Sequence, residues 1–306
     1  MAQQKVTFTS DGLTLAGILH RPRALAKGEK RPAFLVLHGF GTSKDGATPR
    51  QAAEILERLG YIVLRFDMRG CGESGGERAW ILCQDQVRDT SNALTWLARQ
   101  PGVDGKRIGV FGHSFGAAVA VYAGGVDERI AAVIGCGAWG DGVSKFREQH
   151  PSPAQWKRFI TKLEDGRRHR QRTGRSLMIP RFSIVAIPPA QRKNLAGDWI
   201  KRFPAETAMS MMDFRANDVV GLIAPRPLLL LHPAHDTTTP TSQAIGLFQH
   251  AKQPCDMHLV SGVDHFMLSD DQGVVRAIMA DWLGRYLPVK KKSKSAKSKS
   301  SRRKAN

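Results

Sequence analysis

Two serines lie in the pattern Gly-x-Ser-x-Gly, in which glycines flank a candidate nucleophile: Ser114 in residues 112–116 and Ser74 in residues 72–76. Ser114 follows the strand-like run RIGVF and precedes the small-residue helical run AAVAVYAGG. A strand, a sharp turn and a helix are what an exposed serine nucleophile needs, and the glycines leave room for close backbones. Ser74 lies in a glycine-rich loop with no helical pattern directly behind it. We therefore predict Ser114 as the nucleophile; the alternative is a plain helix N-cap.

A serine hydroxyl attacks only when a base removes its proton. Of the ten histidines, His265 lies in the loop between the last strand-like run and the last helical one, at the end of the sheet where Ser114 is expected. His258 falls inside that strand, and His113 is too close to Ser114 in the chain to turn back toward it. We expect His265 to be the general base, the alternative being an ordinary loop histidine.

An acidic side chain must orient that histidine. Asp236 follows the run RPLLLLHPAH and precedes His265 by 29 residues, which gives the chain order Ser, Asp, His. Its carboxylate would hold the imidazole in one tautomer and stabilise the imidazolium. Asp141, at the end of the preceding strand, is the first alternative; Asp213, Asp218 or no acid at all are the others.

Backbone N–H groups must stabilise the oxyanion that forms when serine attacks. We expect one from Phe115, directly after the nucleophile, and one from Phe40 in the glycine-containing loop of residues 38–41. The glycines of this loop could instead only permit a tight turn. A tight turn is compatible with presenting the Phe40 N–H to the oxyanion.

The elements that position these residues follow from the hydrophobic pattern. Apolar and polar residues alternate on either side of Asp11-Gly12, which indicates an N-terminal β-hairpin. Strand-like runs then begin at Phe34, Tyr61, Arg107, Ile130, Arg226 and Asp256, and helical stretches lie at about 51–59, 85–99, after 115, from 241, and up to 287. Strands alternating with helices predict an α/β fold with a mostly parallel central sheet and helices on both faces.

Composition narrows the class of protein. The 306 residues are 42% apolar and 24% charged, which excludes a disordered or fibrous chain. The net charge of +19 comes from two segments: residues 157–202 hold 13 basic and three acidic residues, and residues 288–306 hold nine basic and none acidic. Because the rest of the chain is neutral, the charge distribution argues against a protein whose whole body coats nucleic acid.

We predict one catalytic domain over residues 1–287 and a disordered Lys/Ser-rich tail over 288–306. Residues 141–217, hereafter the insertion, are expected to form a basic lid over the strand ends. Its arginines either face the site, where they would favour anionic substrates, or face water. Six large apolar residues either line an acyl pocket or form the insertion's own core; they are Trp139, just before the insertion, and Trp156, Met209, Met211, Met212 and Phe214 within it.

The four cysteines show no CxxC spacing, so we expect free thiols in a reducing compartment and neither a disulfide framework nor a structural metal. The first ten residues, MAQQKVTFTS, contain no apolar core of a signal peptide, and no apolar run approaches 18 residues. A cytoplasmic protein without a membrane span is the resulting expectation.

Five segments in this order resemble the α/β-hydrolase superfamily, in the branch that joins dienelactone-hydrolase-like esterases to prolyl-oligopeptidase-like peptidases. They are HGFG from His38, DMRGCGESGG from Asp67, GHSFG from Gly112, HPAHDTTTP from His232 and GVDHF from Gly262. The resemblance implies that Asp67, Arg69 and Gly70 shape a loop beside the site. It also assigns GESGG to that loop rather than to the nucleophile.

We therefore expect a serine hydrolase that cleaves a small carboxylic ester through an acyl-enzyme, with no metal or cofactor. Peptidase, thioesterase, acyltransferase and carbon–carbon hydrolase activities use the same residues and remain open. The competing hypothesis is a hydrolase fold without catalysis that binds partners through its basic tail. No specific nucleic-acid partner is expected, and any polyanion contact by the tail should be weak and salt-sensitive.

Overall fold

The computed structural model describes residues 2–23, 25–195, 199–268 and 273–289. Its main sheet has eight strands in the order β1-β2-β4-β3-β5-β6-β9-β10. Their bounds are β1 Ala2–Ser10, β2 Leu13–Arg21, β3 Arg31–Leu37, β4 Ile62–Phe66, β5 Val103–His113, β6 Ile130–Cys136, β9 Leu228–Pro233 and β10 Cys255–Val260. The pairs β1–β2 and β2–β4 are antiparallel and all other pairs are parallel. The predicted N-terminal hairpin and mostly parallel sheet are confirmed.

The hairpin closes at Asp11-Gly12, as its sequence predicts. Both residues have positive φ, 47° and 79°, the backbone that a two-residue turn between right-twisted strands requires. Ser10 and Leu13 pair directly across the turn.

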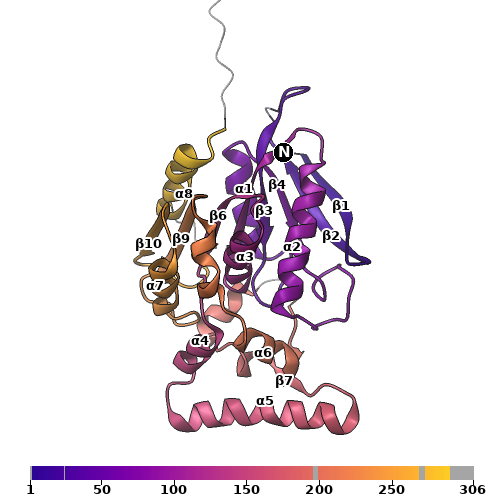
Figure 1. Ribbon diagram of the computed structural model, residues 1–306, viewed down its shortest axis with the longest axis vertical. Coiled ribbons are helices and arrows are strands. Elements are labelled where there is room, and N and C mark those ends of the chain that lie inside the picture. The colour runs from indigo at the N-terminus through magenta and orange to yellow at the C-terminus, as the bar shows by residue number, and fades with distance from the viewer. Residues whose placement is uncertain (1, 24, 196–198, 269–272, 290–306) are drawn as a thin grey trace, which may run out of the picture.

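Helices cover both faces of the sheet (Figure 1). They are α1 Ala47–Arg58, α2 Cys83–Ala98, α3 Phe115–Val126, α7 Thr241–His250 and α8 Gly273–Tyr286. Along β3, Phe34 and Val36 belong to one apolar cluster with α1 and Trp282 of α8, while Leu35 and Leu37 belong to another with α2, α3 and α7. Because side chains alternate along a strand, a run of consecutive apolar residues fills both layers.

One helix begins earlier than the sequence pattern indicates. The amphipathic pattern starts at Gln51, but α1 begins at Ala47 and includes Pro49 in its first turn. Proline is tolerated there because the N–H that it lacks has no partner within the helix.

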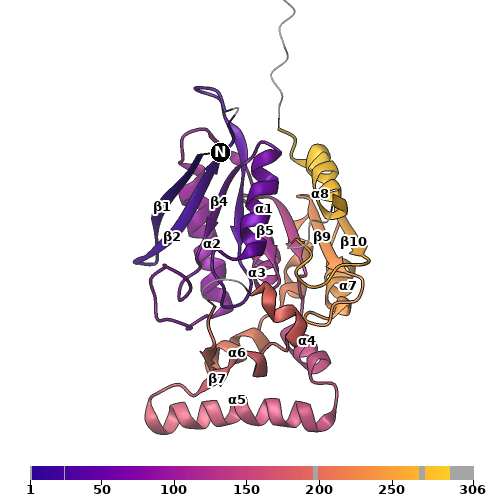
Figure 2. The ribbon, with the colours of Figure 1, turned by 180° about the vertical axis from the view of Figure 1, so that it is seen from behind.

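The insertion lies between β6 and β9, beyond the carboxyl ends of the parallel strands. It contains α4 Gly142–Gln149, α5 Pro153–Thr173, a small antiparallel pair of β7 Met178–Pro180 and β8 Arg202–Pro204, and α6 Ala205–Met212. Short 3₁₀ turns are η1 Arg181–Ser183, η2 Pro189–Asn194 and η3 Ala216–Asp218, and η4 Val220–Ile223 follows the insertion. Figures 1 and 2 show α5 farthest from the sheet, with α6 between the two.

Capping residues explain the limits of the long helix α5. Ser152 and Gln155 form a reciprocal capping box at its start, Pro153 occupies the first turn, and Gly174 ends it in the left-handed conformation. Only three of its residues are buried, Phe159, Leu163 and Gly166.

The six large apolar residues in and just before the insertion form part of a core. Trp139, Met211 and Phe214 are buried within the same cluster as α2 and α3, with Trp156, Met209 and Met212 packed against it. None of them lines the pocket beside Ser114 described below. Of the two roles left open by the sequence, the structure favours core packing.

That core contains a buried lysine. Lys145 on α4 is 2% exposed, its Nζ lies 4.2 Å from the Phe146 ring centroid, and it donates to Gln149 Oε1 at 3.1 Å. Burial disfavours the ammonium and lowers the pKa of Lys145 to about 7, although Cys83 and Asp236 act in the opposite direction.

We expect Lys145→Met to stabilise the protein. The unfolded chain keeps the lysine proton up to about its ordinary pKa of 10.5, whereas the folded chain loses it above about 7. The unfolded state therefore binds more protons in this range, and the free energy of unfolding rises with pH. At pH 7 the variant should gain on the order of 2–4 kcal/mol, and the gain should shrink by about 2 kcal/mol at pH 9.

Urea unfolding at both pH values measures this gain, with Lys162→Met on the exposed face of α5 as the control. Equal pH slopes in the wild type and Lys145→Met would show that Lys145 keeps its ordinary pKa in the folded protein.

None of the helices in the described ranges combines the length and the apolar composition that a membrane span needs. All four cysteines are buried and free of disulfides. Residues 290–306, which make up nearly all of the predicted tail, lie outside the described residues.

Candidate active site

Ser114 occupies a strained turn between β5 and α3. Its backbone has φ 56° and ψ −116°, a conformation that a non-glycine residue adopts only when the surroundings enforce it. The flanking glycines allow the turn, because a Cβ on Gly112 would lie 2.0 Å from the Gly116 carbonyl oxygen and one on Gly116 would lie 2.5 Å from that of His38. The Ser114 N–H donates to the Cys136 carbonyl at the end of β6 at 2.8 Å.

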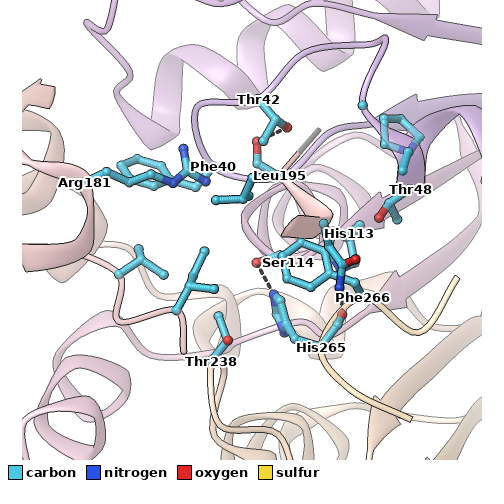
Figure 3. Close-up of a pocket in the computed structure, with 17 residues that line it drawn as sticks. Phe40, Thr42, Thr48, His113, Ser114, Arg181, Leu195, Thr238, His265 and Phe266 are labelled. Carbon is cyan, nitrogen blue, oxygen red and sulfur yellow. Dashed lines mark hydrogen bonds between the residues drawn. The ribbon is translucent and has the colours of Figure 1, made fainter. Parts of the chain in front are cut away.

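The structure brings Ser114, His265 and Asp236 into one hydrogen-bonded chain. His265 lies in the loop between β10 and α8, and its Nε2 is 2.8 Å from Ser114 Oγ (Figure 3). Its Nδ1 is 2.7 Å from Asp236 Oδ2. With the proton on Nδ1, the ring donates to the carboxylate and accepts from the serine hydroxyl, which is the tautomer that a general base needs.

Backbone groups hold the Asp236 carboxylate. Its Oδ1 accepts from the N–H groups of Thr238 at 2.7 Å and Thr239 at 2.9 Å. Burial alone would raise the pKa of Asp236, but His265, His232 and the Thr239 N–H outweigh it, and the pKa lies below its usual value. The side chain therefore stays ionised and presents Oδ2 to His265.

His113 supports the loop that carries His265. Its Nε2 donates to the His265 carbonyl oxygen at 2.9 Å, and burial lowers the pKa of His113 to about 3, so the ring is neutral. Sequence reasoning set His113 aside because it cannot reach Ser114, and its contact with residue 265 leaves no signal in the spacing. Its position next to the candidate nucleophile is the one hint that the sequence offers.

The loop that contains Phe40 is held at its start by His38. His38 Nδ1 donates to the Gly39 carbonyl at 2.9 Å, and its Nε2 accepts from the Met68 N–H at 3.1 Å. The N–H groups of Phe40 and Phe115 donate no hydrogen bond to any residue that the structure describes. Both are therefore available for an external acceptor.

The alternative candidates for the nucleophile, the acid and the base lie outside the chain of hydrogen bonds around Ser114. Ser74 Oγ donates to the Asp67 carbonyl at 2.5 Å and accepts from the Ala16 N–H at 2.9 Å. Asp141 caps α4 through the Ser144 N–H and pairs with Arg215. The remaining candidates are the exposed Asp213 and Asp218 and the half-buried His258 on β10.

Asp67, Arg69 and Gly70 lie in a loop that is hydrogen-bonded to the segment around Phe40. The Asp67 carboxylate accepts from the N–H groups of Lys44 at 2.5 Å and Glu73 at 2.9 Å. Arg69 pairs with the buried Asp89, and Gly70 has a φ of 75°. These contacts join the loop to the segment that follows Phe40.

A pocket opens over Ser114 and His265. The residues that line it include Phe40 and Thr48 from the segment after β3, and Arg181, Ile187 and Leu195 from the insertion. In Figure 3 Arg181 and Phe40 lie next to each other, and Thr48 lies apart from both. In the described part of the chain, no group of three or more His, Cys, Asp or Glu residues is arranged to hold a metal ion.

The family follows from comparison with known proteins. A family model described as serine aminopeptidase, S33, matches residues 28–272, and the chain belongs to this family of α/β-hydrolases.

Particular relatives cover nearly the whole chain. It is 26% identical over 304 residues to polyketide transferase grgF of Penicillium sp, spanning 94% of this chain and 98% of the relative. It is 28% identical over 291 residues to thiohydrolase aneE of Aspergillus aculeatus, spanning 88% and 89%.

Solved structures show the same fold. The crystal structure of α/β hydrolase GrgF from Penicillium sp. sh18 superposes with a TM-score of 0.76 at 26% identity, over 94% of this chain and 99% of that one. Hypothetical protein PA2218 from Pseudomonas aeruginosa superposes with a TM-score of 0.78 at 24% identity, over 94% of each chain.

Proposed function

We propose that this protein is a serine hydrolase that cleaves carboxylic esters through an acyl-enzyme on Ser114. The observation that carries the proposal is the hydrogen-bonded chain from Ser114 Oγ through His265 to the buried Asp236 at a strained turn. A serine without a role in catalysis would need neither the strain nor the aligned imidazole.

In the first half of the reaction, Ser114 Oγ attacks the ester carbonyl while its proton passes to His265 Nε2. Asp236 stabilises the imidazolium without taking its proton. The N–H groups of Phe40 and Phe115 hold the oxyanion of the tetrahedral intermediate. The intermediate collapses, the alcohol leaves with the proton from His265, and the acyl group stays on Ser114.

In the second half, His265 removes a proton from water, the resulting hydroxide attacks the acyl carbonyl, and Ser114 leaves with its proton restored. If an alcohol or amine takes the place of water, the same steps transfer the acyl group instead.

Thioesters are the second candidate substrate class. Relatives named thiohydrolase and polyketide transferase align with 88% and 94% of this chain, and acyl transfer from sulfur uses the same groups.

A panel of oxygen esters, thioesters and anilides with the same acyl group tests the proposal, with Ser114→Ala as the blank. We expect the oxygen esters to be cleaved with a burst of leaving group, which marks an accumulating acyl-enzyme. Faster turnover of the thioesters would favour the second candidate. No turnover above the Ser114→Ala blank for any member would overturn both.

A further inference from the structure

One basic residue between positions 157 and 202 differs from the others in that range. Of the 13 Lys and Arg residues between positions 157 and 202, twelve are exposed and Arg181 is 2% exposed. Exposed charges interact mainly with water and salt, so these twelve residues match the alternative in which the basic side chains face water. Arg181 matches the alternative in which a basic side chain faces the site.

Arg181 reaches the pocket from the end of β7. Its side chain lies alongside the Phe40 ring in Figure 3, with the guanidinium carbon 5.3 Å from that ring's centroid and 5.6 Å from that of Trp199. A Cβ on Gly41 would lie 3.0 Å from Arg181 Nη1. The charge therefore lies against the loop that carries the Phe40 N–H.

The guanidinium has no anionic partner among the described residues. Its Nε and Nη1 are buried and make no hydrogen bond, and no carboxylate pairs with it. Burial lowers the pKa of Arg181 to about 10, so the group stays protonated at neutral pH. A buried charge without a partner is unfavourable, and a bound anion would relieve that cost.

We infer that Arg181 is a binding residue for an anion and that the substrate carries a carboxylate a few bonds from the carbonyl that Ser114 attacks. The inference rests on the proposed function and names its substrate class. Arg181 is the single Lys or Arg among the described residues that line the pocket, so one negative charge matches it. A planar guanidinium fork fits a planar carboxylate through two parallel hydrogen bonds.

Two matched substrate series test the inference, because the carboxylate could belong to either side of the ester. The acyl series compares the phenyl half-ester of adipic acid with phenyl hexanoate. The leaving-group series compares 4-carboxyphenyl acetate with 4-carbamoylphenyl acetate. The variants are Arg181→Met, Arg181→Lys and, as the matched control, Arg167→Met on the exposed face of α5.

In at least one series, we expect the wild type to prefer the carboxylate by about tenfold or more in kcat/KM. Arg181→Met should remove that preference, because its loss in kcat/KM on the carboxylate ester should exceed its loss on the neutral ester by about tenfold, while Arg181→Lys keeps part of the preference. Arg167→Met should behave like the wild type, because its charge lies in water.

Two results would overturn the inference. The first is a wild type that shows no preference for the carboxylate in either series, which needs no variant to fold. The second is an equal loss on charged and neutral esters in Arg181→Met, which would mean that Arg181 acts on the oxyanion. Failure of the proposed function would look different: no ester would be cleaved, while adipate binding in calorimetry would still depend on Arg181.

Discussion

Replacing Ser114 by alanine should lower kcat/KM for ester cleavage by about four to six powers of ten. The variant removes the oxygen that attacks the carbonyl. The His265 imidazole and the N–H groups of Phe40 and Phe115 remain, but no covalent intermediate can form. Because the Ser114 side chain makes one hydrogen bond within the described part of the chain, to His265, the fold should survive the change. Initial rates on the best ester, with spontaneous hydrolysis subtracted, measure the loss.

Ser74→Ala is the matched control, since it changes the other serine in a Gly-x-Ser-x-Gly pattern. Ser74 ties its loop to β2 through the Ala16 N–H, so alanine should reduce stability by about 1 kcal/mol and leave kcat within about threefold. A larger kinetic loss in Ser74→Ala than in Ser114→Ala would reverse the assignment of the nucleophile.

Replacing Asp236 by asparagine should lower kcat by about three to four powers of ten. The amide keeps the size of the side chain and can still accept from the Thr238 and Thr239 N–H groups. Its NH₂ group would then face His265 Nδ1 and make that nitrogen an acceptor. The ring proton would move to Nε2, where it blocks transfer from Ser114 Oγ.

Asp141→Asn is the control, because Asp141 follows the preceding strand and was the first alternative acid. It caps α4 and pairs with Arg215, so its loss should reduce stability while kcat changes little. A kcat of Asp236→Asn near that of the wild type, in a folded protein, would mean that the carboxylate does not orient His265.

The parts of the fold that position Ser114, Asp236 and His265 could be predicted because each depends on local pattern. Apolar runs such as RPLLLLH fill both layers of a parallel sheet, and their carboxyl ends meet at one edge. Chain order then identifies which Asp and which His follow the last two strands. The start of α1 was missed because residues 47–50 contain no apolar face and include a proline.

The position of the insertion in the chain could be predicted from its charge, but the burial of its individual side chains could not. Arg181 has the same residue type as its exposed neighbours, and its burial depends on how β7, Phe40 and Trp199 meet in three dimensions. Likewise, the burial of Lys145 on α4 has no signal in a sequence where lysine is common. Such properties arise from tertiary contacts between segments far apart in the chain.

The most direct test is to react the purified protein with a fluorophosphonate probe and map the labelled peptide by mass spectrometry. We expect a single label on Ser114, absent from Ser114→Ala and much slower in Asp236→Asn, because only an imidazole-activated serine reacts readily. A folded protein that takes up no label, or a label on Ser74, would contradict the assignment of Ser114 as the activated nucleophile.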